Sequence, residues 1–135
     1  MQADTQTAAV SKKRIWGGRI MSALPVLLMV FGGMFGVLKP AVAVAGVVHY
    51  GYAERVVLPI CIVEIACAVV YAIPRTSVLG AILLTGYLGG ATATHVRVGE
   101  PFFLPVIFGV LVWGGLFLRD DRLRALIPLR GQPPQ

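Results

Sequence analysis

The carboxyl group of Glu64 is the residue with the clearest chemical potential in this chain. It lies near the middle of an apolar run, and Cys61 and Cys67 stand three residues to either side, so that all three share roughly one helical face. A carboxylate in hydrocarbon is costly unless it is paired, protonated or facing water. Glu64 is therefore a candidate for proton relay or ligand binding. The alternative is a structural carboxyl that bonds a hydroxyl or imidazole on a neighbouring helix.

A second group of polar residues occupies the third apolar run. Thr85 and Thr92 are seven residues apart and share a helical face, while Tyr87 adds a hydroxyl and His95 closes the run. In membranes such hydroxyls commonly form hydrogen bonds between helices. The sharper hypothesis is that Glu64, this threonine stripe and His95 line one cavity.

The segment after the third run offers groups that can handle protons and anions. His95 can carry a proton near neutral pH, and Arg97 can clamp an anionic or carbonyl group. The loop between the first two runs supplies further candidates for the same polar mouth: His49, Tyr50, Tyr52, Glu54 and Arg55. The alternative is anchoring at lipid headgroups with salt bridges between loops, which contribute little when exposed.

Motifs of soluble enzymes are missing from the sequence. It contains no CxxC pair, no cluster with metal-ligand spacing, no phosphate-binding loop and no dinucleotide fingerprint. The two cysteines are six apart on one expected helix, which disfavours a disulfide between them. We therefore predict no catalytic residue, no metal site and no enzymatic activity of the chain on its own.

The composition places these residues in a membrane. Of 135 residues, 57% are hydrophobic and 13% are charged, and the mean hydropathy is +0.81. A soluble core cannot bury so much apolar surface at this length. Four apolar runs, each long enough to cross a bilayer, predict an all-α bundle of four transmembrane helices within residues 20–118: about 20–38, 56–73, 77–94 and 102–118.

The charges predict the orientation of this bundle. The formal net charge is +6, and nine of the twelve Lys and Arg residues lie before the first run, between the second and third, or after the fourth. An even number of spans puts both termini on one side, and this excess makes it the cytoplasmic side of a bacterial inner membrane. The expected partner of the basic residues is the lipid bilayer, and no nucleic-acid partner is expected. We predict a disordered basic tail over 1–19 and a basic amphipathic tail over 119–135.

The segment 39–55 lies between the first two runs. The apolar start of this segment is too short to span a membrane, which predicts an interfacial or re-entrant segment. A signal peptide ending at Ala43-Val44-Ala45 is the competing reading.

Gly32 with Gly36, and Gly86 with Gly90, form small-xxx-small pairs that predict close helix packing, within the chain or with another copy.

Three stretches resemble the DoxX-like family of small bacterial membrane proteins: Val63 to Cys67, Ile73 to Gly80, and TGYLGGATATHVRVGEP from Thr85 to Pro101. The tail VLVWGGLFLRDDRLRALIPLR is similar to the same group, and the resemblance covers roughly Met21 to Arg130. It implies a four-helix membrane bundle with both termini inside. The family's namesake is a small membrane subunit linked to quinone-coupled sulfur oxidation. The family's most recognisable positions correspond to Glu64, Gly89, Gly90, His95 and Arg97.

These observations lead to three functional hypotheses. The first is an accessory or subunit of a membrane redox system, with a quinone as possible cofactor in a small polar pocket near Glu64, Thr92 and His95. There His95 would bond a carbonyl oxygen and Glu64 would exchange protons. The second is a small-molecule or proton-linked transporter that acts as a homodimer. The third is an assembly factor that holds other membrane proteins. Besides the bilayer, the expected partners are a second copy of the chain or a membrane redox partner.

Overall fold

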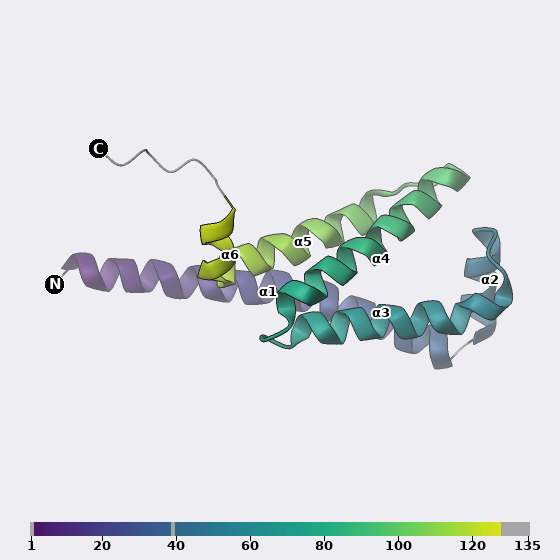
Figure 1. The fold of residues 1–135 in the computed structure, drawn as a ribbon, viewed down its shortest axis with the longest axis horizontal. Helices are drawn as coiled ribbons and strands as arrows, with labels where there is room; N and C mark the ends of the chain where they lie inside the picture. Colours follow the sequence, from purple (N-terminus) through teal and green to yellow (C-terminus); the bar gives the residue numbers. More distant parts are fainter. Residues whose placement is uncertain (1, 39, 128–135) are drawn as a thin grey trace.

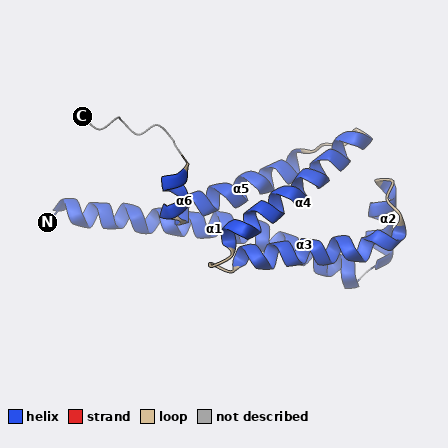
Figure 2. Ribbon diagram, viewed as in Figure 1, coloured by secondary structure: helices blue, strands red, loops and turns tan. Residues whose placement is uncertain are grey.

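The computed structural model describes residues 2–38 and 40–127, with side chains from residue 12 onward. Within these ranges every regular element is helical and no strand occurs (Figure 2). The elements are α1 (Gln2–Leu38), α2 (Pro40–His49), the short 3₁₀ helix η1 (Glu54–Val56), α3 (Val57–Ala72), α4 (Ser77–Val98), α5 (Phe103–Arg119) and α6 (Asp121–Leu126). The predicted all-α architecture is confirmed.

Four helices form the body of the molecule. The chain runs in alternating directions through α1, α3, α4 and α5, and α2 lies at the end opposite the N-terminus (Figure 1). Helix α1 contacts α3 and α5, and α4 contacts the same two helices. The body is therefore a ring of four helices in which each has two antiparallel neighbours.

Helix boundaries follow from local chemistry. Pro40 opens α2, and Pro59 and Pro105 lie in the first turns of α3 and α5, where a missing N–H costs no helical hydrogen bond. Gly99 ends α4 in the left-handed conformation, with φ of 76°. Its N–H donates to the carbonyl of Val96, which is the usual way a glycine closes a helix.

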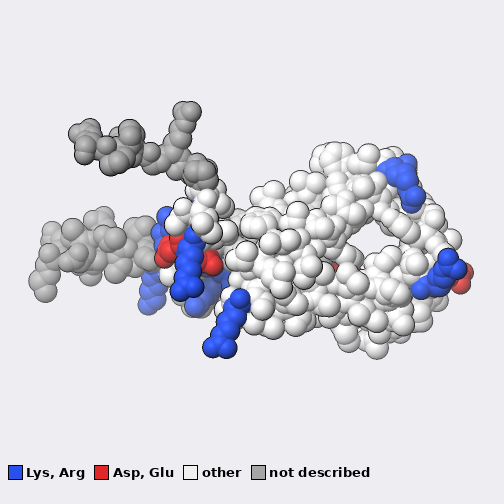
Figure 3. Space-filling model, in the orientation of Figure 1, with Lys and Arg blue, Asp and Glu red and all other residues white. Residues whose placement is uncertain are grey.

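The core lies at the end of the bundle that holds the α3–α4 turn. Tyr71, Leu84 and Leu116 come from α3, α4 and α5 and are almost completely buried there. Close approach at this end depends on Gly80, because a Cβ added to it would lie 2.3 Å from backbone atoms of Tyr71. Toward α2 the packing opens, and a gap passes through the space-filling surface between α4 and α3 (Figure 3).

Apolar side chains cover the outside of the bundle. Large residues such as Phe31, Leu27 and Phe103 are 72%, 68% and 62% exposed. Lys and Arg gather at the two ends of the face that Figure 3 shows, and the surface between them is free of charge apart from a small acidic patch at the edge of the gap. An apolar surface of this extent needs lipid or protein to cover it, which agrees with residence in a membrane.

Three described segments have the length and apolarity to cross a membrane: Lys12–Leu38, Glu54–Ala72 and Ser77–Val98. The fourth predicted span corresponds to α5, a helix of 17 residues. All four predicted spans therefore coincide with helices. Three of these helices are long and apolar enough to be candidate membrane spans.

Both predicted tails contain helix in the described residues. Residues 2–19, predicted as a disordered tail, continue α1. Their C-terminal part packs against the bundle, since a Cβ at Gly18 would lie 2.8 Å from the Gly115 carbonyl oxygen and Arg14 pairs with Asp121. At the other tail, α6 covers Asp121–Leu126 and Leu123 packs on the core; residues 128–135 lie outside the described part.

The segment between the first two spans is also helical. Residues 40–49 form α2, which has no buried residue and, with ten residues, reaches about half the thickness of a bilayer core. Whether α2 enters the membrane stays a prediction.

Candidate functional site

Glu64 sits where three helices meet. It lies in the middle of α3 and is half-buried. Its carboxyl group interacts with the Tyr87 hydroxyl of α4. A Cβ at Gly32 of α1 would lie 3.7 Å from its Oε1. The structure thus gives Glu64 a hydroxyl partner on one side and a helix surface without a side chain on the other.

Glycines bring α1 close to this part of α3. A Cβ at Gly36 would lie 2.6 Å from Cys61 Sγ, and a Cβ at Gly33 would lie 2.6 Å from Ile65 Cγ1. The pair Gly32 and Gly36 therefore faces α3 of the same chain. Cys61 and Cys67 are buried, free thiols, and Cys61 fills the space that Gly36 leaves.

The second glycine pair faces outward. A Cβ at Gly86 or Gly90 of α4 would have no atom within 4 Å, and the same holds for Gly89. All three residues are exposed. This small-residue face of α4 has no partner among the described residues.

The predicted threonine stripe does not reach Glu64. Thr85 accepts a hydrogen bond of 2.8 Å from Trp113 Nε1 and therefore lies on the α4–α5 side. Thr92 donates to the Leu88 carbonyl of its own helix. Tyr87 lies about 140° around the helix from Thr92. Among these α4 hydroxyls, Tyr87 is the one that interacts with Glu64, and a common cavity for Glu64, Thr92 and His95 stays a prediction.

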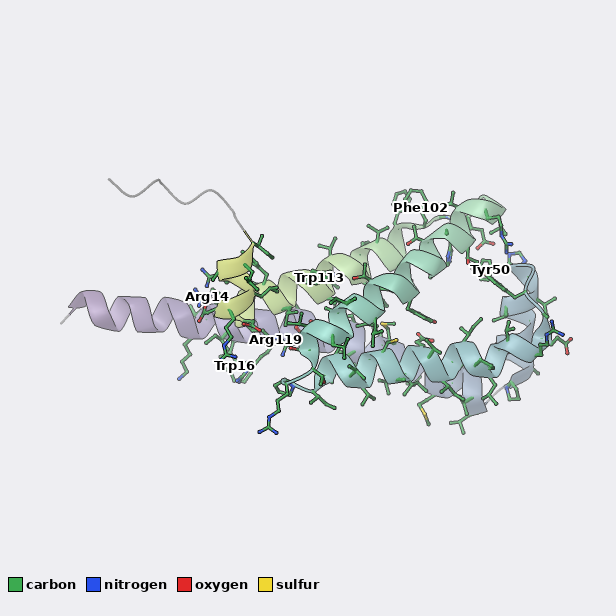
Figure 4. All side chains as sticks on the ribbon, viewed as in Figure 1. Arg14, Trp16, Tyr50, Phe102, Trp113 and Arg119 are labelled. Atoms are coloured by element: carbon green, nitrogen blue, oxygen red, sulfur yellow. The ribbon has the colours of Figure 1, made fainter. Side chains whose placement is uncertain are left out.

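A second polar group joins α2 to the end of α4, and we call it the α2–α4 cluster. It comprises His49, Tyr50, Tyr52, Thr94, His95, Arg97 and Glu100. Tyr50 marks its position between the ends of α2 and α4 (Figure 4). The structure thus brings together the predicted His49, Tyr52, His95 and Arg97, whereas Glu54 and Arg55 lie in η1 outside the cluster and are exposed.

Hydrogen bonds connect this cluster into a chain. His49 Nε2 donates to Glu100 Oε1 at 2.6 Å, and the Tyr50 hydroxyl donates to Glu100 Oε2 at 3.0 Å. The Tyr50 oxygen lies 3.2 Å from His95 Nε2, and His95 Nδ1 donates to the Ala91 carbonyl. Such a sequence of imidazole, carboxylate and phenol groups can pass a proton along it.

Two further contacts brace the cluster. The Tyr52 and Thr94 hydroxyls bond at 2.7 Å. Arg97 donates to the Tyr50 carbonyl and stacks over the Tyr52 ring. These contacts tie the loop after α2 to the last turns of α4.

The electrostatics of the cluster centre on Glu100. Hydrogen bonds from His49 and then Tyr50 hold the pKa of the Glu100 carboxyl below its ordinary value. The pKa of Tyr50 is raised, first by burial and then by its bond to Glu100. Both shifts favour an ionised Glu100 beside a neutral Tyr50.

A third polar group was missed by the sequence analysis. The Tyr71 hydroxyl lies 2.8 Å from Ser22 Oγ and donates to the Val112 carbonyl at 2.7 Å. The Arg119 guanidinium stacks on the Tyr71 ring. These residues lie far apart along the chain, so their contact could not be predicted from spacing. The one relevant signal in the sequence was the positive charge at the end of the fourth run, to which Arg119 belongs.

Among the described residues, no group of His, Cys, Asp and Glu is placed to hold a metal ion. The polar groups instead lie at three depths of an apolar helical bundle: Glu64 with Tyr87 at mid-helix, the α2–α4 cluster at one end, and Tyr71 with Ser22 and Arg119 toward the other. Fold and site together define a small helical membrane protein. The chain belongs to the DoxX-like family, whose sequence profile matches residues 20–115 and so includes Glu64 and the α4 part of the α2–α4 cluster. The resemblance seen in the sequence is confirmed. No curated protein and no solved structure gave a significant match.

Proposed function

We propose that the protein crosses a bacterial inner membrane four times, with both termini in the cytoplasm. The alternating directions of α1, α3, α4 and α5 support this arrangement. Helix α5 has 17 residues, the lower end of the ~17–25 that span a bilayer core. Nine of the twelve Lys and Arg residues lie before the first predicted span, between the second and third, or after the fourth, as the positive-inside rule expects of the cytoplasmic side.

We further propose that the protein serves as an accessory or subunit of a membrane redox system and holds a quinone-class molecule beside Glu64. The observation that carries this proposal is the pairing of Glu64 with Tyr87 in mid-membrane helices. An ionisable residue at this depth marks a functional site by default. The resemblance to the DoxX-like family suggests the redox setting.

The residues around Glu64 fit an amphipathic ring compound. Gly32 leaves the α1 side of the carboxyl open, and the gap between α3 and α4 lies on the α2 side of the core (Figure 3). A carboxyl and a phenol are suitable partners for a carbonyl or hydroxyl oxygen. Tyr87 packs against the apolar core, and most small-molecule sites combine an apolar lining with a few polar groups of this kind.

Each polar residue would then have a distinct role. When bound, a quinone supplies the electron-accepting ring. Tyr87 would donate a hydrogen bond to a ring oxygen, and Glu64 would hold or release a proton at its carboxyl group. The α2–α4 cluster, with its chain from His49 to His95, would pass protons at the far end of α4 and position that helix.

Native mass spectrometry of the gently solubilised protein with added ubiquinone tests this proposal. We expect one bound quinone on wild type and on Glu54→Gln, the matched control, because Glu54 is exposed in η1. Glu64→Gln should weaken binding roughly tenfold, as expected for the loss of a hydrogen bond to an ionisable group. Absence of bound quinone from all three proteins, or equal binding to all three, would contradict the proposal.

A second candidate function rests on the outward glycines of α4. Gly86, Gly89 and Gly90 form a surface on which another helix can pack closely, which favours a homodimer acting as a transporter or assembly factor. A dimer without quinone, unchanged by Glu64→Gln in the same spectra, would favour assembly. Uptake into vesicles driven by a pH gradient and lost in Glu64→Gln would favour transport.

A further inference from the structure

A groove at the opposite end of the bundle from the α2–α4 cluster has so far no role. It encloses a cavity of about 270 Å³ between α1, α3 and α5. We call it the arginine groove, and its lining consists of Arg19, Ser22, Ala23, Val26, Leu27, Tyr71, Ala72 and Arg119. It is independent of Glu64, which does not line it.

The groove is apolar along its length and cationic at one end. Ala23, Val26 and Leu27 continue from Arg19 along α1, a distance of about 12 Å from the arginine. Ala23, Leu27 and Ala72 are exposed, so the groove is open sideways. A ligand that fits it must combine an anionic end with an apolar chain.

Both arginines are available to an anion. Among the described residues, Arg119 makes no salt bridge; its guanidinium stacks on Tyr71 and its buried Nε has no hydrogen-bond partner. Arg19 stacks on Trp16 and likewise makes no described salt bridge. Arg119 lies near Arg14 and Trp16 where α1, α5 and α6 meet (Figure 4).

The neighbouring carboxylates are already engaged. A second cavity of about 500 Å³ adjoins the groove, shares Arg19 and Arg119 with it, and includes Asp120 and Asp121. Asp121 pairs with Arg14 and Arg124 at 2.9 and 3.0 Å. Asp120 accepts backbone N–H bonds at the start of α6. Neither carboxylate lines the groove itself, whose charged lining residues are Arg19 and Arg119.

The depth of the groove matches a lipid headgroup. Trp16, which is 55% exposed, lies beside Arg19, and tryptophan favours the membrane–water interface. Arg19 and Arg119 then stand at phosphate level while the apolar lining extends toward the hydrocarbon. Basic pockets of this kind between spanning helices bind anionic lipid headgroups.

We propose that the arginine groove binds one anionic phospholipid, with its phosphate between Arg19 and Arg119 and one acyl chain along Ala23, Val26 and Leu27. Arginine is suited to this role because its planar fork donates two hydrogen bonds to one phosphate. The bound lipid bridges α1, α3 and α5 at the end where the bundle is most tightly packed.

Native mass spectrometry with dioleoyl phosphatidylglycerol, and with dioleoyl phosphatidylcholine for comparison, tests the proposal. Wild type should retain one phosphatidylglycerol and lose phosphatidylcholine. Arg19→Gln should weaken retention roughly tenfold, as expected for a lost charged hydrogen bond. The matched control is Arg75→Gln, because Arg75 is exposed on the α3–α4 turn and lines neither cavity; it should bind like wild type.

Further variants separate the contributions of charge and shape. Arg119→Gln should weaken retention similarly, and Arg119→Lys should restore part of it, with circular dichroism reporting whether each variant is folded. Ala23→Phe should reduce retention by filling the apolar groove while leaving both arginines in place. If Arg19→Gln and Arg75→Gln lost phosphatidylglycerol equally, retention would depend on surface charge in general, and the proposal would be overturned. Displacement of the lipid by millimolar inorganic phosphate would also overturn it, since the site would then recognise the anion alone.

Discussion

At the scale of single residues, the close contacts between helices depend on glycines, which have no side chain, as much as on buried side chains. Gly80 lets α4 approach the backbone of Tyr71, and this contact places the Tyr71 hydroxyl between Ser22 and Val112. Gly33 and Gly36 do the same for α1 against α3. The position of Glu64 between α1 and α4 follows from these close approaches.

The Gly80→Ala substitution should therefore destabilise the protein. The added Cβ would lie 2.3 Å from the Tyr71 Cα and N atoms, which cannot move without displacing α3. We expect a loss of about 1–3 kcal/mol or more, as for other overpacked cores. Thermal unfolding in detergent measures it.

Gly86→Ala on the same helix is the matched control. It adds the same methyl group into open space and should leave the melting temperature unchanged or raise it slightly, because alanine favours a helix more than glycine does. Equal melting temperatures for the two variants would contradict the packing described for Gly80.

At the scale of elements, α2 is held by polar contacts more than by burial. It has no buried residue, and the bonds of His49 and Tyr50 to Glu100 join its end to α4. Few apolar contacts imply low local stability. The docking of α2 should thus respond to conditions that leave the core intact.

Acid should release α2. The pKa of Glu100 is lowered by His49 and Tyr50, so its stabilising contribution is present above the unfolded value of about 4.3 and is lost as pH falls through the lower folded value. Hydrogen-exchange protection factors of residues 46–52, measured against pH, should fall over that range. In the Glu100→Gln variant these protection factors should be low and should not change over that pH range.

Glu54→Gln serves as control for this experiment because Glu54 lies outside the cluster. It should keep the pH dependence of wild type. At the alkaline end the raised pKa of Tyr50 has the opposite effect: its contribution persists below the unfolded value of about 10 and is lost as pH rises through the folded value. An acid response that survives in Glu100→Gln would assign the pH dependence to another group.

At the scale of the whole molecule, the two ends of the bundle differ in kind. One end has the tightly packed core, the arginine groove and α6; the other has the gap between α3 and α4, closed off by the α2–α4 cluster. Charged residues gather at both ends, and apart from Glu64 the helical stretches between them carry no Asp, Glu, Lys or Arg (Figure 3). This polarity is what a membrane orientation requires.

The number of spans can be read from the sides of the membrane that the turns occupy. In a background of Cys61→Ala and Cys67→Ala, we would place single cysteines by Ala53→Cys, Arg75→Cys and Ala125→Cys. With four spans, an impermeant maleimide should label position 53 in intact cells and positions 75 and 125 only after permeabilisation. Labelling of position 125 together with position 53 would mean that α5 does not cross.

The sequence by itself determined the membrane residence, the helical class and the places of the four long helices. These properties depend on local composition and on proline and glycine positions, which act within one helix. It also indicated that His49, Tyr52, His95 and Arg97 would gather, since the loops that carry them adjoin helix ends on one side. The sequence analysis did not expect the helical course of residues 14–19, where Gly18 packs against α5 and Arg14 pairs with Asp121 of α6.

Only the tertiary structure decided which helix faces meet. The Gly32–Gly36 and Gly86–Gly90 pairs have the same spacing, yet the first packs on α3 and the second faces outward. Likewise Thr85 of the α4 stripe bonds Trp113 of α5, while Tyr87 of the same helix interacts with Glu64. Spacing along a helix fixes which residues share a face, but the rotation of that helix against its neighbours depends on contacts from distant segments. For the same reason the meeting of Arg19 with Arg119, from opposite ends of the chain, required the folded bundle.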